Sequence, residues 1–516
     1  MLPKAALSAE PSSPGWKEII SFQSDSISAF LRESNAILKK NNPDILFYMN
    51  GNTLAPSWPT GRDNRKIIPE TDILGAEGGF LYGELKEPIY KPGAMAKLLE
   101  TQSGGKPRVV FDAAKQGPWT FSTLPSGEIS ILYSQTITHQ ANVWLAVSAV
   151  SNLHDEELDI IRKYNRFIKA NPGPFHETRS LARTGLVWPQ ETVNFYSGST
   201  VPLTDFTKEI TKEKAGNIEE EFYGFYDALV RLHIPFDVID EPAIETDLSK
   251  YDALILPNVA CLSRSACSKL KEYVVKGGNI LSTFETSVFD ENGVRLPEPG
   301  LGELSGIHSG SEIFGPLRWD YIALADPGHF ALKGIPNRLL ASPEYGLRIK
   351  SGAASPVMFC KPLPGSYSGS PVQSEYPFMT ENRAGKGRSV YIAGTIGGAL
   401  HKYHFPEYYQ LIGNIIRGFS SAAVTLEDAP SSVEVAVRRK DNTLYIYLIN
   451  FTSEMKRPAR RIIPVSGIGI SVPVSERIRS ARALWTGQDL KFKTTGNNFV
   501  LSLPILEEYE IIELRT

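Results

Sequence analysis

The chain is poor in the residues and segments that mark several classes of protein. It has three cysteines among 516 residues, and no two of them are spaced as a CxxC pair. So sparse a set excludes a disulfide framework, shows no zinc-binding pattern and favours a reducing, cytoplasmic compartment. The first residues lack the apolar core of a signal peptide, and no run of about 18 apolar residues predicts a membrane span.

A surplus of charge of one sign is also missing. The 54 Lys and Arg residues nearly balance the 57 Asp and Glu residues, so the net charge is −3. This balance predicts neither a nucleic-acid partner nor binding to an anionic membrane. Hydrophobic residues make up 42% of the chain and charged residues 22%, which is typical of a globular protein. At roughly 150 residues per domain, the length predicts about three domains.

Strand and helix patterns alternate over residues 1–175. Helical spacing predicts a helix at residues 22–40, and two more at 91–102 and 129–140. Apolar runs predict strands at residues 44–49, 72–76, 108–111 and 142–147. Units of this size indicate a parallel sheet or barrel. A closed barrel needs eight strands in about 250 residues, so these four strands predict the C-terminal part of a TIM-type barrel.

A partial barrel leaves exposed some surfaces that are buried in a complete parallel sheet. Parallel sheets are buried on both faces, and unpaired strand edges promote association. We therefore expect the strands near Ile45 and Val143 to pair with, or to be covered by, another segment or chain.

Two further regions follow. In residues 176–424, predicted strands at 236–239, 253–257, 279–284 and 389–394 alternate with helices, which indicates a flavodoxin-like, doubly wound sheet. From about residue 425 the apolar pattern changes to a period of two, which predicts a small antiparallel β-sandwich domain over 425–516. The fold class is therefore α/β with a C-terminal β domain.

Two strands of the predicted barrel run into carboxylates. Asp112 follows the run Val109-Val110-Phe111, and Glu77 follows the second strand and precedes Gly78-Gly79. Active-site groups of barrels lie at strand C-terminal ends, so we expect both carboxylates to face one pocket. Asp112 is a candidate nucleophile, with a helix cap or a salt bridge as the structural alternative. Glu77 is a candidate catalytic acid or sugar contact, with an ordinary turn as the alternative.

Three other side chains are candidate substrate contacts. Trp119 and Trp58 have the ring faces that stack on sugars, although aromatic side chains more often pack in a core. Asn50 follows the first predicted strand, where its amide can bind a hydroxyl group or cap the next segment.

The remaining histidines and cysteines favour structural interpretations. His139 is expected to pack or to cap a helix. His401 and His404 are spaced as metal ligands on a helix, but no third ligand accompanies them, so we predict no metal site; with Tyr403, His404 can instead reach a neighbouring subunit. Cys261 lacks the flanking glycines of a nucleophile elbow and is expected to be structural.

Several segments together carry a family resemblance. They are Trp16 with residues 22–26, residues 106–112, residues 133–135 with His139, residues 251–257 and residues 273–278. With the order of the three regions, they resemble glycoside hydrolase family 42, the trimeric β-galactosidase type. In this resemblance residues 106–112 correspond to strand seven of the barrel, and residues 251–257 and 273–278 to the trimerisation domain.

The resemblance implies hydrolysis of a β-linked carbohydrate by a homotrimer without a cofactor. Two departures stand out. Asp112 occupies the position of the family's nucleophilic glutamate and is shorter by one methylene group. The family's acid/base glutamate follows strand four, in the part of the barrel that the pattern does not show. The alternative is therefore a non-catalytic carbohydrate-binding or assembly protein, either a pseudoenzyme or the product of a gene fragment.

Overall fold

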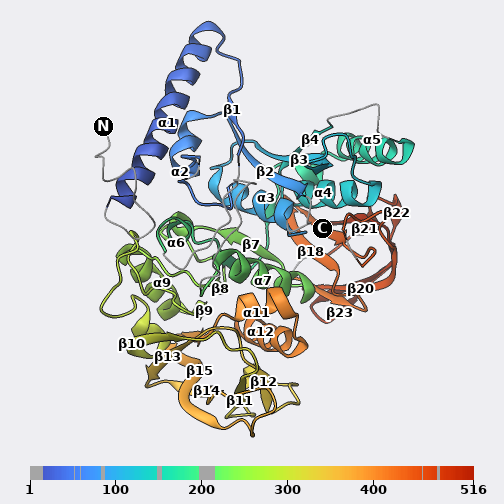
Figure 1. The fold of residues 1–516 in the computed structure, drawn as a ribbon. Helices are drawn as coiled ribbons and strands as arrows, with labels where there is room; N and C mark the ends of the chain where they lie inside the picture. The colour runs from blue at the N-terminus through green and yellow to red at the C-terminus, as the bar shows by residue number, and fades with distance from the viewer. Residues whose placement is uncertain are drawn as a thin grey trace.

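The computed structural model describes residues 15–51, 53–58, 60–82, 88–147, 154–196, 215–455, 457–473 and 477–516. Their strands form five sheets. Helix α1 stands at one margin of the molecule, and strands β10 to β15 lie at the opposite end (Figure 1). None of the described helices is both long enough and apolar enough to cross a lipid bilayer.

The N-terminal region is a four-stranded parallel sheet in the order β1-β2-β3-β4. Its elements are α1 (Trp16–Asn41), β1 (Tyr48–Met49), α2 (Asn64–Ile67), β2 (Ile73–Tyr82), α3 (Lys91–Gln102), β3 (Arg108–Gly117), α4 (Ser126–Thr138), β4 (Asn142–Ala146) and α5 (Asp155–Ala170). The sequential order of parallel strands is that of part of a barrel, as the sequence predicts.

The two faces of this sheet differ. On one face, which we call the covered face, Leu74, Ala76 and Val110 are buried in the core that α3 and α4 build. The opposite face, which we call the open face, carries Tyr48, Gly75, Glu77, Phe111 and Trp144. Trp144 is 49% exposed there.

A nine-stranded sheet forms the second region, in the order β12-β11-β14-β15-β16-β9-β8-β6-β7. The strands from β16 to β7 are parallel, and the others are antiparallel. The parallel strands are β6 (Thr184–Val187), β7 (Phe236–Ile239), β8 (Ala253–Leu256), β9 (Asn279–Thr283) and β16 (Gly387–Ile392). The antiparallel strands are β11 (Tyr321–Leu324), β12 (Leu339–Ala341), β14 (Ala354–Cys360) and β15 (Gln373–Ala384), and β10 (Ile307–Phe314) pairs separately with β13 (Gly346–Ser351).

Both faces of the parallel strands are buried. Ile255 joins the core of α7 (Ile218–Arg231), α11 (Ile396–Tyr403) and α12 (Pro406–Phe419), whereas its neighbours Leu254 and Leu256 join the core of α9 (Arg264–Lys276). Adjacent residues of a strand point to opposite faces, so the sheet lies between two helix layers. This is the doubly wound arrangement that the sequence predicts.

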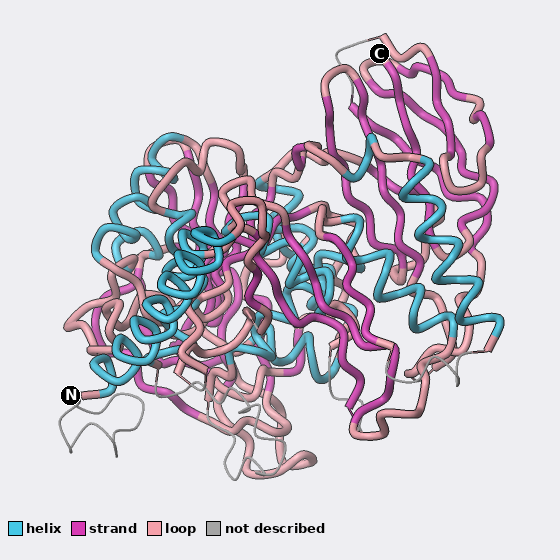
Figure 2. The backbone as a smooth tube through the Cα atoms, turned by 90° about the horizontal axis from the view of Figure 1, so that it is seen from above, coloured by secondary structure: helices cyan, strands magenta, loops and turns pink. Residues whose placement is uncertain are grey.

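The C-terminal strands form two antiparallel sheets around a separate core, gathered at the end of the molecule that carries the C-terminus (Figure 2). The first sheet contains β17 (Thr425–Glu427), β20 (Val465–Pro473), β23 (Phe492–Thr495) and β24 (Asn498–Leu506). The second contains β5 (Arg179–Ser180), β18 (Val433–Lys440), β19 (Thr443–Asn450), β21 (Ser480–Ala483), β22 (Gln488–Asp489) and β25 (Tyr509–Arg515).

A buried ionic cluster joins the three regions. Lys97 of α3 and His139 after α4 lie 3.0 and 3.1 Å from Glu434 Oε1 of β18. The Lys97 ammonium also lies 3.3 Å from the ring centroid of Phe236 on β7. Burial alone raises the pKa of Glu434, but Lys97 and His139 outweigh it and lower that pKa to about 2. The prediction of a packed His139 is confirmed.

Candidate functional site

Glu77 is the carboxylate that the open face presents. Asn50, which directly follows β1, donates a hydrogen bond from Nδ2 to Glu77 Oε1 at 2.6 Å. Asn50 Oδ1 accepts a 2.8 Å hydrogen bond from the Tyr48 hydroxyl, and the Glu77 amide donates to the Gly51 carbonyl at 2.9 Å. This chain of hydrogen bonds holds the carboxylate at the junction of β1 and β2.

A buried guanidinium group lies beside this chain. Arg62 donates from Nε to Asn64 Oδ1 at 2.9 Å and from Nη2 to the Gly75 carbonyl, and its Nη1 has no partner among the described residues. Burial lowers the pKa of Arg62 to about 10, although Tyr48 and Glu77 act to raise that pKa. Burial raises the pKa of Glu77, and the positive charge of Arg62 opposes that rise. A carboxyl with a raised pKa is suited to proton donation.

Three aromatic rings cover the centre of the open face. Trp144 lies 5.6 Å from Tyr48 and 5.0 Å from Phe111, measured between ring centroids. Tyr48 and Trp144 come from opposite edge strands, and their rings meet above the open face. Gly75 permits this contact, because a Cβ atom there would lie 2.0 Å from the Tyr48 ring.

Asp112 lies on the other side of the sheet. Its side chain is fully buried on the covered face, where Oδ2 accepts a 3.2 Å hydrogen bond from the Thr136 hydroxyl of α4. Burial raises the pKa of Asp112 well above its ordinary value. The expectation that Asp112 and Glu77 face one pocket is therefore wrong. In the register Glu77 pairs with Phe111, so Asp112, the next residue, points the opposite way.

The strand ends explain part of this error. The sequence predicts that the second and third strands stop before Glu77 and Asp112. In the structure β2 and β3 continue to Tyr82 and Gly117, so both carboxylates lie within strands. Within a strand the pleat determines the face to which a side chain points, whereas after the strand the conformation of the loop determines it.

The predicted sugar contacts have different surroundings. Trp119 lies in the loop after β3 and is 58% exposed, with Phe121 beside it in sequence at 70%. Trp58 packs edge-on against Trp16 of α1, at 5.6 Å between centroids. The Trp119 ring is therefore largely exposed, whereas Trp58 is part of a packing contact.

Tyr48, Arg62 and Trp144 were not identified from the sequence. The spacing of Tyr48 and Asn50, two residues apart, was an available signal, because such residues share one face of a strand. No local pattern marks Arg62 as a neighbour of the site, since its partner Gly75 belongs to β2, another segment of the fold.

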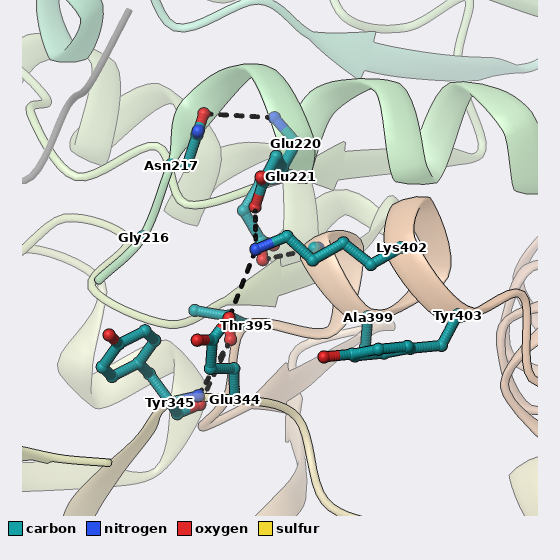
Figure 3. Close-up of a pocket in the computed structure, with 11 residues that line it drawn as sticks. Gly216, Asn217, Glu220, Glu221, Glu344, Tyr345, Thr395, Ala399, Lys402 and Tyr403 are labelled. Atoms are coloured by element: carbon teal, nitrogen blue, oxygen red, sulfur yellow. Dashed lines mark hydrogen bonds and ion pairs between the residues drawn. The ribbon is translucent and has the colours of Figure 1, made fainter. Parts of the chain in front are cut away.

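A second polar pocket lies in the nine-stranded region (Figure 3). Lys402 of α11 bridges Glu220 and Glu344, at 3.1 and 3.2 Å. Behind it the Glu221 carboxylate accepts hydrogen bonds from the amides of Gly397 and Gly398 in the first turn of α11, at 3.2 and 3.0 Å. Burial raises the pKa of Glu221 to about 8. The chain's own carboxylate thus occupies the position where a helix N-terminus binds anionic ligands.

The remaining candidates are held in structural contacts. Cys261 is fully buried, and burial raises the pKa of its thiol well above the ordinary value. His404 Nδ1 lies 2.9 Å from the Tyr409 hydroxyl, which donates to Asp227 at 2.6 Å. The described residues contain no cluster of three metal-ligating side chains.

Comparison with known proteins finds a family model that matches the second region. Residues 183–410 match the model of the β-galactosidase trimerisation domain. β-Galactosidase BgaA of Planococcus sp. (strain 'SOS Orange') is 22% identical over 466 residues, which cover 84% of this chain and 61% of BgaA. The chain therefore spans about three fifths of the length of that relative.

Solved structures show the same architecture over the whole chain. The β-galactosidase from Bacillus circulans sp. alkalophilus superposes with a TM-score of 0.71 and 19% identity, over 100% of this chain and 71% of its own. The α-L-fucosidase isoenzyme 2 from Paenibacillus thiaminolyticus superposes with a TM-score of 0.69 and 15% identity, over 95% and 71%. These similarities support the partial barrel and the trimerisation fold.

Proposed function

Because the chain is glycoside hydrolase family 42-like, we propose that it hydrolyses β-linked glycosides at the open face of β1–β4. The observation that carries the proposal is the hydrogen-bonded placement of Glu77 on this open face. Glu77 donates the proton to the leaving group, and Asn50 orients it. Trp119 offers its exposed ring to the apolar face of a sugar. Asp112 has a structural role on the covered face.

The assembly is part of the same proposal. Residues 1–175, 176–424 and 425–516 form three domains, and the middle domain assembles a cytoplasmic homotrimer. The match of residues 183–410 to a trimerisation domain supports this assembly. Trp58 contributes packing against α1 and no sugar contact.

A complete hydrolase site needs a second carboxyl group. Retaining enzymes place their two carboxyls about 5–5.5 Å apart, and inverting enzymes about 6.5–9.5 Å apart. Among the described residues, the hydrogen-bond and charge partners of Glu77 include no carboxylate. This favours the second candidate function, a carbohydrate-binding protein that does not turn over its ligand.

A pair of conservative substitutions tests the assignment. Nitrophenyl glycosides, including the β-D-galactoside and the α-L-fucoside, are the substrates for the purified chain. We expect Glu77→Gln to lower kcat by about 100-fold or more, the contribution of a general acid, and Asp112→Asn to change it less than about threefold. Loss of activity in Asp112→Asn with Glu77→Gln active would reverse the roles. No turnover across the panel, with sugar binding detected by calorimetry, would establish the binding protein instead.

Arg62 supplies a second test of Glu77. A general acid must be protonated, so activity falls as the pH rises through its pKa. Arg62 opposes the raised pKa of Glu77, so Arg62→Leu is expected to move the alkaline limb of the kcat profile to higher pH. Arg62→Lys keeps the charge and is the matched control. An unmoved limb in the leucine variant, with its fold intact by circular dichroism, would exclude Glu77 as the proton donor.

A further inference from the structure

A cavity lies at the junction between the second region and the C-terminal strands. It is formed where α7 and α12 end, next to the start of β6 and to β17, and its volume is about 110 Å³. The two helices lie side by side, close to the C-terminal strands (Figure 1). A single water molecule needs about 10–15 Å³ of such space, so the cavity has room for a small organic molecule. Glu77 and its partners do not line it.

The ionisable side chains that line this cavity are all basic. They are Arg183, His233 and Arg417, and no Asp or Glu residue of the described chain lines it. Arg183 forms an ion pair with Asp252, which lies outside the lining. Burial lowers the pKa of His233 below its ordinary value, which favours the neutral imidazole. The uncompensated charge of the wall therefore comes from Arg417.

Arg417 is a cation without a counter-ion among the described residues. Its Nη2 donates a 3.2 Å hydrogen bond to the carbonyl of Leu232, at the end of α7, and no carboxylate forms an ion pair with it there. Burial lowers the pKa of Arg417, and no acidic group of the described chain opposes that effect. A guanidinium group carries five N–H donors in a planar fork, so donors remain for an anionic ligand.

The surroundings of Arg417 restrict the kind of anion. Arg417 belongs to the last turn of α12 and caps the end of α7, so the partial negative charges of two helix C-termini lie beside it. These partial charges favour an anion with one negative charge over a doubly charged phosphate. The larger apolar side chains of the wall are Leu232, Ile234, Pro235, Ile416, Val424 and Leu426. The wall thus suits a carboxylate group that is attached to a short apolar body.

We propose that this cavity binds a small monocarboxylate with a short apolar body and holds its carboxylate group on Arg417. The guanidinium donates to the two carboxylate oxygens, and the apolar wall covers the body of the ligand. The Ser421 and Thr425 hydroxyls also line the cavity and can donate to the same carboxylate. A ligand bound there links α12 to β17, so its binding stabilises the folded protein. This site is separate from Glu77, and the inference does not depend on the proposed function.

Calorimetry with an isosteric pair of ligands tests the proposal. Butyrate and butyramide have nearly the same size and shape, but only butyrate is charged. Each is titrated into the full chain in low-salt buffer near neutral pH. We expect butyrate to bind saturably with a Kd in the millimolar range, because it offers few atoms for contact, and to raise Tm. Butyramide should bind at least about tenfold more weakly, because it lacks the charge-assisted hydrogen bonds.

Three variants locate the bound carboxylate. Arg417→Gln should weaken butyrate binding at least about tenfold and change butyramide binding little. Arg264→Gln removes an exposed arginine of α9 outside the cavity and should leave both affinities unchanged. Ala422→Glu keeps Arg417 but adds a carboxylate at an exposed position of the wall, which should compete with butyrate. Circular dichroism confirms that each variant is folded.

Each other outcome overturns the proposal. Equal affinities for butyrate and butyramide would show that the charge of the ligand is not recognised. Butyrate binding that survives both Arg417→Gln and Ala422→Glu would place the ligand elsewhere. Inorganic phosphate that binds more tightly than butyrate, and loses this binding in Arg417→Gln, would replace the monocarboxylate by a phosphate. Absence of saturable butyrate binding to the folded chain would exclude a monocarboxylate of this size.

Discussion

The two parallel sheets of this protein use the same strand chemistry but are covered differently. The parallel strands of the nine-stranded sheet are packed by helices on both faces, and the pocket at their ends is filled by Glu221 and the Lys402 ion pairs. The β1–β4 sheet is packed on one face, and its other face presents Glu77 and the exposed Trp144 ring. In the pocket of the nine-stranded sheet the charged groups pair with one another, whereas the open face of the β1–β4 sheet presents a carboxylate that can bind a ligand.

The largest expected effect concerns the covered side of the β1–β4 sheet. Lys97→Met leaves Glu434 buried without its cation, which should lower the free energy of unfolding by about 3–5 kcal/mol. Lys163→Met, which breaks an exposed ion pair with Glu508, should cost less than about 1 kcal/mol. Urea titrations monitored by tryptophan fluorescence measure the free energy of unfolding of the two variants. Equal losses would show that the junction of the three regions contributes no more than a surface contact.

The next effect concerns the filled pocket of the nine-stranded sheet. The folded-state pKa of Glu221 is about 8, above the ordinary value, so the folded protein holds this proton more tightly than the unfolded chain. Stability from this group is present at low pH and is lost as the pH rises toward about 8. Glu221→Gln should reduce the decline in Tm between pH 5 and pH 9, measured by calorimetry. If Tm declines as steeply in the variant, ionisation of Glu221 is not the cause of the decline.

A smaller effect is expected on the open face. Gly75→Ala places a methyl group 2.0 Å from the Tyr48 ring, and overpacking of this kind costs about 1–3 kcal/mol. Gly328→Ala is a suitable control, because its methyl group would meet its nearest atom at 3.4 Å. Thermal unfolding of both variants measures the difference. Recovery of stability in the double variant Gly75→Ala/Tyr48→Ala would assign the cost to the ring.

The smallest effect is expected at Asp112. Burial raises the pKa of Asp112 and so favours the neutral form of its side chain, and Asp112→Asn supplies a neutral amide of similar size. We expect the free energy of unfolding at pH 7 to change by less than about 1 kcal/mol, within the usual range for a conservative change. A loss of several kcal/mol in a urea titration would show instead that the carboxyl is charged in the folded protein.

Local periodicity was sufficient to predict most elements. The helix at residues 91–102 and the strand at 236–239 have the predicted limits, and α4 lies within a few residues of its predicted range, 129–140. The first strand is predicted at residues 44–49 but covers only Tyr48–Met49. Tyr48 pairs with Ile73, the first residue of β2, so the residues before Tyr48 have no partner in that strand. Strands β20 and β24 lie in segments where no strand was predicted, and they depend on pairing with each other.

The sequence by itself determined the order of most helices and strands and the presence of Asn50, Glu77 and Asp112 at the first, second and third strands, because hydrophobic spacing and residue identity are local properties. The tertiary structure decided which carboxylate reaches the open face. That choice depends on strand register, which pairs Glu77 with Phe111 and turns Asp112 toward Thr136 of α4. Register is set by contacts between segments distant in sequence, such as Tyr48 over Gly75, and a single residue of shift exchanges the two faces.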